Sequence, residues 1–448
     1  FSRRRHQLHT ITDDTDSADL HGCPSFTSLG DHKKMTLNRR TFVKLGALSS
    51  VALGAHAKSA FADQDAALKP MASQARPITR EEYLQRQETA RRYMHDAEID
   101  AIVLTGGTTL QYFTGAQWGI SERLFALVVP AKGELAWVAP AFEKARALEQ
   151  IKFGNDVRTW QEDESPYQLV ASILRDRGVV SGKLGIEETM RFAFSDGIAK
   201  SAPALKLISA DPVTARCRRI KSAHEIELMR LANQITLKAF EIALKTLKEG
   251  ITTNELSGRI AAAHQQLGAR GGALVLFGEH SALPHGTITP QKLREGDIVL
   301  IDGGCNVANY ASDITRTTVF GKPTGKQLKV FDIVKRAQAA ALKTARPGVA
   351  CEDVDAAARK VITDAGFGPD YKYFTHRVGH GIGMDGHEWT YLVRGNKTKL
   401  EAGMTFSDEP GIYVPGEFGM RLEDIMVITG NGAELLTGQA PSLEHPFG

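Results

Sequence analysis

The sequence predicts an α+β protein of two domains, an α/β domain over residues 79–211 and a second domain over residues 212–440. The first observation is length, because 448 residues exceed what a single core ordinarily organises. The second is the alternation of helical and strand-like patterns in residues 79–205. The third is an internal repeat in the second domain, which predicts two similar halves with helices packed outside a curved sheet.

Composition places the chain among ordinary soluble globular proteins. Apolar residues make up 42% and charged residues 24% of the sequence. The net charge is only +3, with both signs interspersed, so we expect neither a nucleic acid nor a membrane as partner. The four cysteines form no CxxC pair, and their spacing predicts neither a zinc ribbon nor a disulfide framework.

The first domain reads as a series of short elements separated by Gly and Pro. Residues 81–97 predict an amphipathic helix, and residues 101–104, 124–129 and 135–138 predict buried strands. No cluster of chemically reactive residues occurs in this domain. We therefore expect the chemistry in the second domain.

The internal repeat of the second domain is marked by glycines. Gly250 and Gly268 enclose one helical pattern, and Gly348 and Gly366 enclose another. The glycines are 18 positions apart in both copies, and the copies are 98 positions apart. A site between two such halves would draw ligands from both of them.

The region before the domains predicts an export signal. Residues 1–34 are polar, show no apolar periodicity, and are left unassigned and expected to be disordered. Residues 35–62 contain the pair Arg39-Arg40, a mildly apolar run and small-residue cleavage sites, the order of a twin-arginine signal. The sequence thus predicts a periplasmic protein, whereas translation from Met71 would leave a cytoplasmic one.

Two predicted hairpins each present facing acids. In the first, a turn centred on residues 307–308 would set Asp302 opposite Asp313. In the second, a turn centred on Gly416 would set Glu409 opposite Glu423. Facing carboxylates repel one another, and an ionised carboxylate at the end of a buried strand is unfavourable unless it is paired or binds a metal.

A glycine-rich segment over residues 376–388 lies between the two hairpins. Its glycines allow bends that bring His380 and His387 into close proximity. Four carboxylates and one imidazole suit two hard or borderline divalent ions. Such a pair, ~3.5–4 Å apart, activates water and polarises a carbonyl group.

At these residues the sequence resembles the pita-bread metallopeptidases, which include proline dipeptidases, Xaa-Pro aminopeptidases and methionine aminopeptidases. The resemblance covers roughly residues 80–440. The domain before the hairpins is similar to the N-terminal domain of the proline-directed branch and of creatinase, which methionine aminopeptidases generally lack. The matching segments are Leu300 to Gly304, Ser312 to Thr317, His376 to His387, Glu409 to Tyr413 and Arg421 to Asp424.

The resemblance implies a pseudo-twofold pita-bread domain with a defined metal site. Asp302 would bind one ion, and His380 with Glu409 would bind the other. Asp313 and Glu423 would bridge both ions. Glu409 would also act as the general base that takes a proton from the attacking water.

The resemblance also implies roles around the metals. His285 would support the tetrahedral intermediate, although it could be a simple loop histidine. His387 would contact the substrate carbonyl group or the leaving nitrogen. Arg421 would orient ligands or bind a substrate carboxylate, although it could merely neutralise nearby acids, and Arg394 is a second candidate for the carboxylate. Tyr310 and Trp118, the latter from this chain or a neighbouring subunit, are candidates for the proline pocket.

Two positions depart from the family pattern. Relatives have a tyrosine 14 residues before the histidine matched by His285, and a gap-free count falls on Gly271, followed by Gly272. Neither supplies a hydroxyl group, so stabilisation of the intermediate would depend more on the histidines and metals. Ser407-Asp408 stands where relatives often have Thr-Ile, which adds a carboxylate beside Glu409.

The implied activity is hydrolysis of Xaa-Pro bonds, with a dipeptidase (prolidase) favoured over an Xaa-Pro aminopeptidase acting on longer peptides. Two rival interpretations are a metal-free creatinase-like hydrolase and a non-catalytic binding module. We expect manganese at the two metal positions, with cobalt, zinc and iron as alternatives. The resemblance also implies a homodimer.

Overall fold

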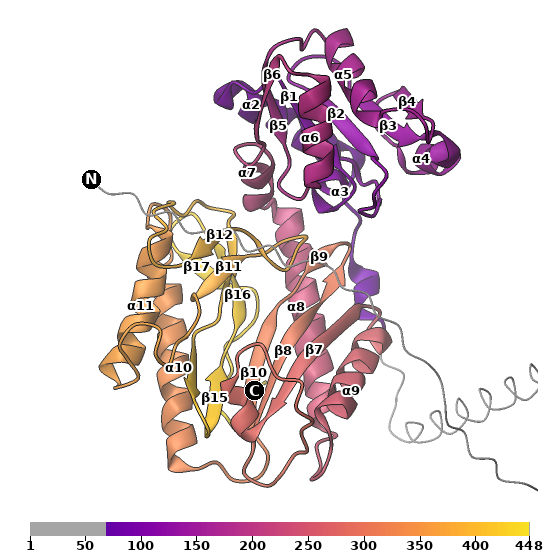
Figure 1. Ribbon diagram of the computed structural model, residues 1–448. Coiled ribbons are helices and arrows are strands. Elements are labelled where there is room, and N and C mark those ends of the chain that lie inside the picture. The colour runs from indigo at the N-terminus through magenta and orange to yellow at the C-terminus, as the bar shows by residue number, and fades with distance from the viewer. Residues whose placement is uncertain (1–68, 448) are drawn as a thin grey trace, which may run out of the picture. The chain divides into compact units, whose positions relative to one another are not determined.

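The computed structural model describes residues 69–447 (Figure 1). The expected twin-arginine signal over residues 35–62 and the unassigned residues 1–34 lie outside this range. Within residues 69–447, every helix is too short or too polar to span a lipid bilayer.

The first domain contains a six-stranded mixed sheet in the order β4-β3-β2-β1-β5-β6. Its strands are β1 (Ala101–Thr105), β2 (Ala126–Pro130), β3 (Ala136–Pro140), β4 (Asp156–Trp160), β5 (Gly182–Ile186) and β6 (Leu205–Ser209). β2 runs antiparallel to both of its neighbours, and the other neighbouring pairs run parallel. The first three strands overlap the strands expected from the sequence.

Helices cover both faces of this sheet. They are α2 (Arg80–Ala97), α3 (Thr108–Thr114), α4 (Lys144–Gln150), α5 (Pro166–Asp176) and α6 (Phe192–Ser201). Ile102 and Leu104 of β1 share a core with Met94 of α2, whereas Val103 shares the opposite core with Ile173 of α5. Because both faces are buried, β1 is apolar at consecutive positions instead of alternate ones.

The second domain repeats a helix-helix-strand pattern. The first half contains α8 (Ala223–Leu244), α9 (Thr253–Gln266), β7 (Arg270–Phe277), β8 (Ile298–Val307), β9 (Tyr310–Ala311) and β10 (Ile314–Val319). The second half contains α10 (Gly325–Thr344), α11 (Cys351–Asp364), β11 (Gly379–Gly381), β12 (Glu388–Leu392), β13 (Thr405–Asp408), β14 (Gly411–Val414), β15 (Phe418–Arg421), β16 (Asp424–Ile428) and β17 (Ala433–Leu435). A short helix, α7 (Thr214–Arg219), precedes both halves.

The sheets of the two halves meet along one edge. The first sheet has the order β10-β8-β7 and the second the order β12-β11-β13-β16-β17, with β14 and β15 forming a separate pair. An isolated bridge between Thr315 and Glu423 connects the two halves. Helices α8 and α9 pack against the first half, and α10 and α11 against the second (Figure 1).

The repeat glycines occupy equivalent places in the two halves. Gly250 and Gly348 precede α9 and α11, and Gly268 and Gly366 follow them. All four have a positive φ, between 80° and 92°. A side chain would strain that conformation, so the spacing of 18 corresponds to one helix with its two flanking turns.

The first hairpin differs from the expectation by one position. Its turn lies at residues 308–309, which both have positive φ, as in a two-residue type I′ turn. Asp302 therefore pairs with Thr315, and Asp313 lies diagonally across from it. The expected turn at residues 307–308, with Asp302 directly opposite Asp313, is wrong because positive φ is required one residue further along.

Candidate active site

The hairpin around Gly416 has the register expected from the sequence. Gly411 faces Arg421 across β14 and β15, and Asp408 faces Asp424 across β13 and β16. Glu409 and Glu423 lie between these two pairs, at corresponding positions of the short segments that connect the strands. The bridge from Glu423 to β10 then brings the acids of both hairpins together.

His380 lies on β11, between the two hairpins, and is buried. Its Nδ1 lies 3.0 Å from the carbonyl oxygen of Gly381. A carbonyl oxygen only accepts hydrogen bonds, so Nδ1 carries the proton and Nε2 has a free lone pair. Nε2 lies 3.4 Å from Glu409 Oε1 and 3.8 Å from Asp313 Oδ2. A histidine that donates one ring N–H to a backbone carbonyl is the usual arrangement of a metal ligand.

All five expected ligands converge in three overlapping groups, and the ligand atoms of each group lie within 4.8 Å of one another. The groups are Asp302, Asp313 and Glu423; His380, Glu409 and Glu423; and Asp313, His380 and His387. Asp313, Glu423 and His380 each belong to two groups, and Asp313 and Glu423 are the two carboxylates among them. This shared membership fits the bridging roles implied by the resemblance.

The charges of the site are strongly coupled. Burial, followed by repulsion from neighbouring carboxylates, raises the pKa values of Asp313 and Glu423 well above their ordinary range. Burial raises the pKa of Glu409 to about 7 and lowers the pKa of His380 to about 3. The protein alone does not neutralise this cluster. Carboxylate oxygens together with one neutral imidazole fit two divalent ions, which would supply the missing positive charge.

Two hydroxyl groups hold the carboxylates in place. Thr315 Oγ1 lies 2.9 Å from Asp302 Oδ1 and 2.7 Å from Glu423 Oε2, so one side chain contacts acids of both halves. Ser407 Oγ donates to Glu409 Oε1 at 3.1 Å. The sequence assigned no role to either hydroxyl group, because a threonine or serine on a strand is common in any sheet.

The ligands border a cavity of about 440 Å³. His285 reaches it from an exposed loop after the short helix Gly278–Ala282, and the ring of His387 stacks on His380 with centroids 3.7 Å apart. The cavity is lined by His285, Asp302, Asp313, Tyr371, Thr375, His376, Arg377, His380, His387, Val393, Glu409, Arg421 and Glu423. All eight site residues expected from the sequence are thus part of one cavity.

Comparison with known proteins identifies the family. The model of metallopeptidase family M24 matches residues 227–430, and the model of the creatinase/prolidase N-terminal domain matches residues 86–220. The probable dipeptidase PepE of Mycobacterium tuberculosis is 38% identical over 365 residues, which cover 80% of this chain and 95% of that protein. The chain belongs to metallopeptidase family M24.

Solved structures confirm the fold of this M24 protein. The crystal structure of dipeptidase PepE from Mycobacterium ulcerans has a TM-score of 0.76 and 35% identity, covering 82% of this chain and 99% of that one. The recombinant prolidase from Thermococcus sibiricus has a TM-score of 0.73 and 34% identity, covering 80% and 97%. The pita-bread domain and the creatinase-like N-terminal domain expected from the sequence are therefore both present.

Arg421 of the M24 site is buried and makes several contacts within the protein. Its Nη2 donates to Asp302 Oδ2 at 2.6 Å, and its Nη1 lies 2.7 Å from the Tyr413 hydroxyl and 3.3 Å from the Pro284 carbonyl oxygen. Its Nε donates to Thr315 Oγ1 at 3.1 Å. These contacts suit a residue that orients the expected metal ligand Asp302. Binding of a substrate carboxylate by Arg421 stays a prediction.

His376 is a residue of the cavity to which the sequence assigned no role. Its Nδ1 donates to the Arg377 carbonyl oxygen at 2.8 Å, and its Nε2 accepts from the Tyr413 hydroxyl group at 2.8 Å. Burial lowers its pKa to about 3, so it is neutral. The spacing of His376 and His380 was visible in the sequence, but only the fold shows that both border one cavity.

Neither aromatic residue expected at the proline pocket lies there. The Tyr310 side chain is buried and donates its hydroxyl proton to Glu225 at 2.7 Å. Trp118 is buried in the first domain, where it stacks on Phe125 with ring centroids 4.0 Å apart. The expectation is wrong for Tyr310 and for Trp118 of the same chain, because each ring is held by a partner outside the cavity, whereas a Trp118 from a neighbouring subunit stays a prediction.

The departure at Gly271 has a structural reason. A Cβ atom at Gly271 would lie 2.6 Å from the Gly304 carbonyl oxygen and 2.7 Å from His264, so no tyrosine fits there. The next residue, Gly272, has open space at its Cβ position and lies on the same face of β7 as Leu274, which pairs with Asp302. The gap-free count therefore falls on the face of β7 opposite to the one that Leu274 and Asp302 share.

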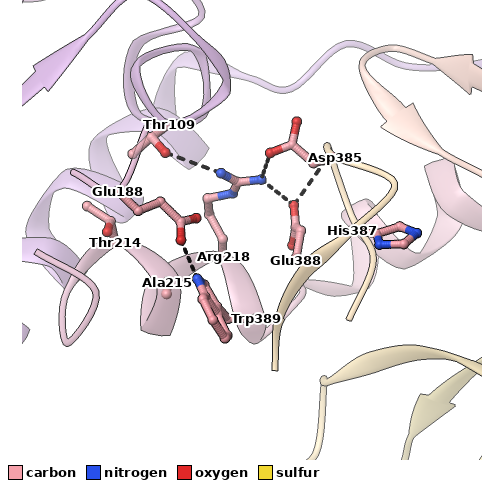
Figure 2. A pocket seen from close by; sticks show the side chains of 9 residues that line it. All are labelled: Thr109, Glu188, Thr214, Ala215, Arg218, Asp385, His387, Glu388 and Trp389. Atoms are coloured by element: carbon pink, nitrogen blue, oxygen red, sulfur yellow. Dashed lines mark hydrogen bonds and ion pairs between the residues drawn. The ribbon is translucent and has the colours of Figure 1, made fainter. Parts of the chain in front are cut away.

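A buried ion network supports the loop that carries His387 (Figure 2). Glu388 accepts from Arg218 Nη2 at 2.5 Å and from Lys221 Nζ at 2.9 Å. Asp385 accepts from Arg218 at 2.5 Å and from Thr108 Oγ1 at 2.6 Å. Figure 2 shows one nitrogen of the Arg218 guanidinium bonded to both of these acids, so both ends of the short loop around His387 are fixed.

Proposed function

We propose that this chain is an Xaa-Pro dipeptidase that uses two divalent ions. The observation that carries the proposal is the convergence of all five expected ligands on one cavity with His285 and His387. The similar proteins named dipeptidase and prolidase support this substrate class.

The chain's own residues supply the proton transfers. Two divalent ions at these ligands would polarise the scissile carbonyl group and make water nucleophilic near neutral pH. Glu409, oriented by Ser407, takes the proton of the attacking water. Arg377 Nη2 donates to His387 Nδ1 at 3.2 Å, which leaves the His387 proton on Nε2 as a donor to the carbonyl oxygen or leaving nitrogen. His285 stabilises the tetrahedral intermediate.

The decisive experiment compares Ala-Pro with Ala-Pro-Ala. Metal-stripped protein should be inactive on both peptides, and added manganese should restore cleavage, faster on Ala-Pro. Asp302→Asn, prepared in parallel, should stay inactive with metal. Cleavage of Ala-Pro-Ala without cleavage of Ala-Pro would identify an Xaa-Pro aminopeptidase instead.

Manganese is the metal that we propose. Four carboxylates and one imidazole form an oxygen-rich site, which suits manganese better than a thiolate-binding metal. Reconstitution with manganese, cobalt, zinc and iron in turn should give the highest kcat/KM with manganese. A higher value with zinc, together with zinc in the protein as isolated, would contradict this choice.

We further propose export to the periplasm through the twin-arginine motif at Arg39-Arg40. Cell fractionation of the full chain should place it in the periplasm. Replacing both arginines by lysine should retain it in the cytoplasm. If the unmodified chain and the lysine variant are distributed identically between cytoplasm and periplasm, translation from Met71 would be favoured.

A homodimer is the assembly that we propose. Ile288 and Phe192 are large apolar side chains that are almost fully exposed, and a second copy could cover such surface. Light scattering of the purified chain should give about twice its mass of 48.8 kDa. A mass near that of a single chain would contradict the proposal.

A further inference from the structure

We propose that Arg377 binds the free C-terminal carboxylate of the substrate and thereby selects dipeptides. This inference rests on the proposed dipeptidase function and names the group responsible for its specificity. Arg377 lies two residues before β11, the strand of the expected metal ligand His380, and it lines the active-site cavity. A dipeptidase requires such a cation, because its substrate carries a carboxylate next to the scissile bond.

The cavity contains two arginines, Arg377 and Arg421, and they differ in how many of their donors the protein already uses. Arg421 is 2% exposed, pairs with Asp302 and directs three further donors at Tyr413, Thr315 and the Pro284 carbonyl oxygen. Binding a substrate carboxylate would require it to break contacts that hold a metal ligand. Most N–H donors of Arg421 are therefore already used in hydrogen bonds within the protein.

Arg377 has the opposite arrangement. Its guanidinium lies over the Tyr391 ring at 4.0 Å and makes one hydrogen bond, from Nη2 to His387 Nδ1. Among residues 69–447, no carboxylate lies within 4.0 Å of it. The ring holds the guanidinium in place while several of its N–H groups stay free. A planar, oriented guanidinium with free donors is suited to a carboxylate.

The position of Arg377 also fits the length of a dipeptide. In Xaa-Pro the carboxyl carbon lies three bonds beyond the scissile carbonyl carbon, and each added residue moves it roughly 3.8 Å further. Arg377 contacts His387, which in turn stacks on His380. The guanidinium thus contacts the edge of the ring whose face stacks on His380, so one side chain links the cation to an expected metal ligand. The C-terminal carboxylate of a tripeptide lies one residue further from the scissile bond, and it would therefore lie beyond Arg377.

Arg394, the other candidate from the sequence, does not line the cavity. It pairs with Asp370 at 2.9 Å and is largely exposed. Arg394→Met is therefore a matched control that removes a nearby guanidinium from outside the site.

The test compares Ala-Pro with Ala-prolinamide, which differ only in the terminal charge. We expect the manganese-reconstituted full chain to prefer the acid by roughly 10- to 100-fold in kcat/KM, the range of a charge-assisted hydrogen-bonded pair. Arg377→Met should abolish this preference, Arg377→Lys should keep part of it, and Arg394→Met should keep all of it. Any displacement of His387 affects both substrates equally and cancels in the ratio.

Each outcome distinguishes the inference from the proposed function. Equal losses on both substrates in Arg377→Met would show that Arg377 only positions His387, and would overturn the inference. Cleavage by the unmodified chain without an acid preference would overturn it as well, and would leave the peptidase intact. Cleavage of neither substrate would overturn the proposed function itself. If Arg377→Met does not fold, the ratio in Arg377→Lys and competition by L-proline against L-prolinamide decide the question.

Discussion

Thr315 connects the two halves of the site through a single hydroxyl group. It contacts Asp302 of the first half and Glu423 of the second, and it accepts from Arg421. A group that orients metal ligands in this way typically contributes 10- to 100-fold to metal affinity.

Thr315→Val should therefore weaken metal binding by roughly 10- to 100-fold. The substitution keeps the shape of the side chain and removes the hydroxyl group that orients both acids. Metal titration followed by calorimetry measures the change. Thr318→Val is the control, because that hydroxyl group donates to the Leu443 carbonyl oxygen at 2.8 Å, away from the ligands. An equal loss of affinity in both variants would contradict the role of Thr315.

The sequence was sufficient to predict which acids and which histidine lie together, and insufficient to predict the groups that hold them in place. Asp302, His380 and Glu423 were recognisable by type and order, because only acids and histidines serve a site of this kind. Thr315 and Arg377 were not recognisable, because their roles depend on which partners surround them. Whether the N–H donors of an arginine are free or already bonded depends on contacts that only the folded structure shows.

At the scale of elements, the loop around His387 depends on Glu388. This carboxylate accepts from Arg218 and Lys221 and from the backbone N–H groups of Met384 and Asp385. Burial alone would raise its pKa, but the two cations outweigh burial and lower it to about 2. The buried carboxylate is thus ionised at neutral pH.

Glu388→Gln should lower the free energy of unfolding by about 3–5 kcal/mol, because it leaves buried cations without their charged partner. It should also reduce activity, since the loop carries His387. Urea denaturation and kcat/KM measure the two effects. Glu401→Gln is the control, because its pair with Arg219 is partly exposed and is worth at most about 1 kcal/mol. Similar unfolding curves for the two variants would contradict this prediction.

The hairpins show where prediction of elements from sequence reaches its limit. The turn at Gly416 was placed correctly, because glycine marks a position that needs positive φ. The turn at residues 308–309 was placed one position too early, because Ala308 and Asn309 adopt positive φ without any glycine. This shift of the turn by one position places Thr315, and not Asp313, opposite Asp302.

At the scale of the whole molecule, the acids of the site oppose folding when no metal is bound. The pKa values of Asp313, Glu423 and Glu409 are raised in the folded chain, so it retains protons that the unfolded chain has released. The free energy of unfolding then falls as pH rises. His376 and His380 act in the opposite direction, but only below about pH 6.5, since unfolded histidine is neutral above it.

Metal-stripped protein should therefore lose stability as pH rises above about 6.5, by on the order of 1.4 kcal/mol per pH unit for each proton involved. Thermal unfolding across this range measures the slope. Added manganese should raise the Tm most at the upper end, where it competes with fewer protons. Asp313→Asn should flatten the slope, and an unchanged slope in that variant would contradict the assignment.

Because the bridge between Thr315 and Glu423 joins the two halves, ion capture would be a late event in maturation. The first half contributes only Asp302 and Asp313, and the second contributes His380, Glu409 and Glu423. A chain with one half unfolded offers at most three donors and no shared pair of bridging acids. Tight binding of the second ion would therefore report that both halves have docked, and the compartment in which docking finishes would decide which metal the protein receives.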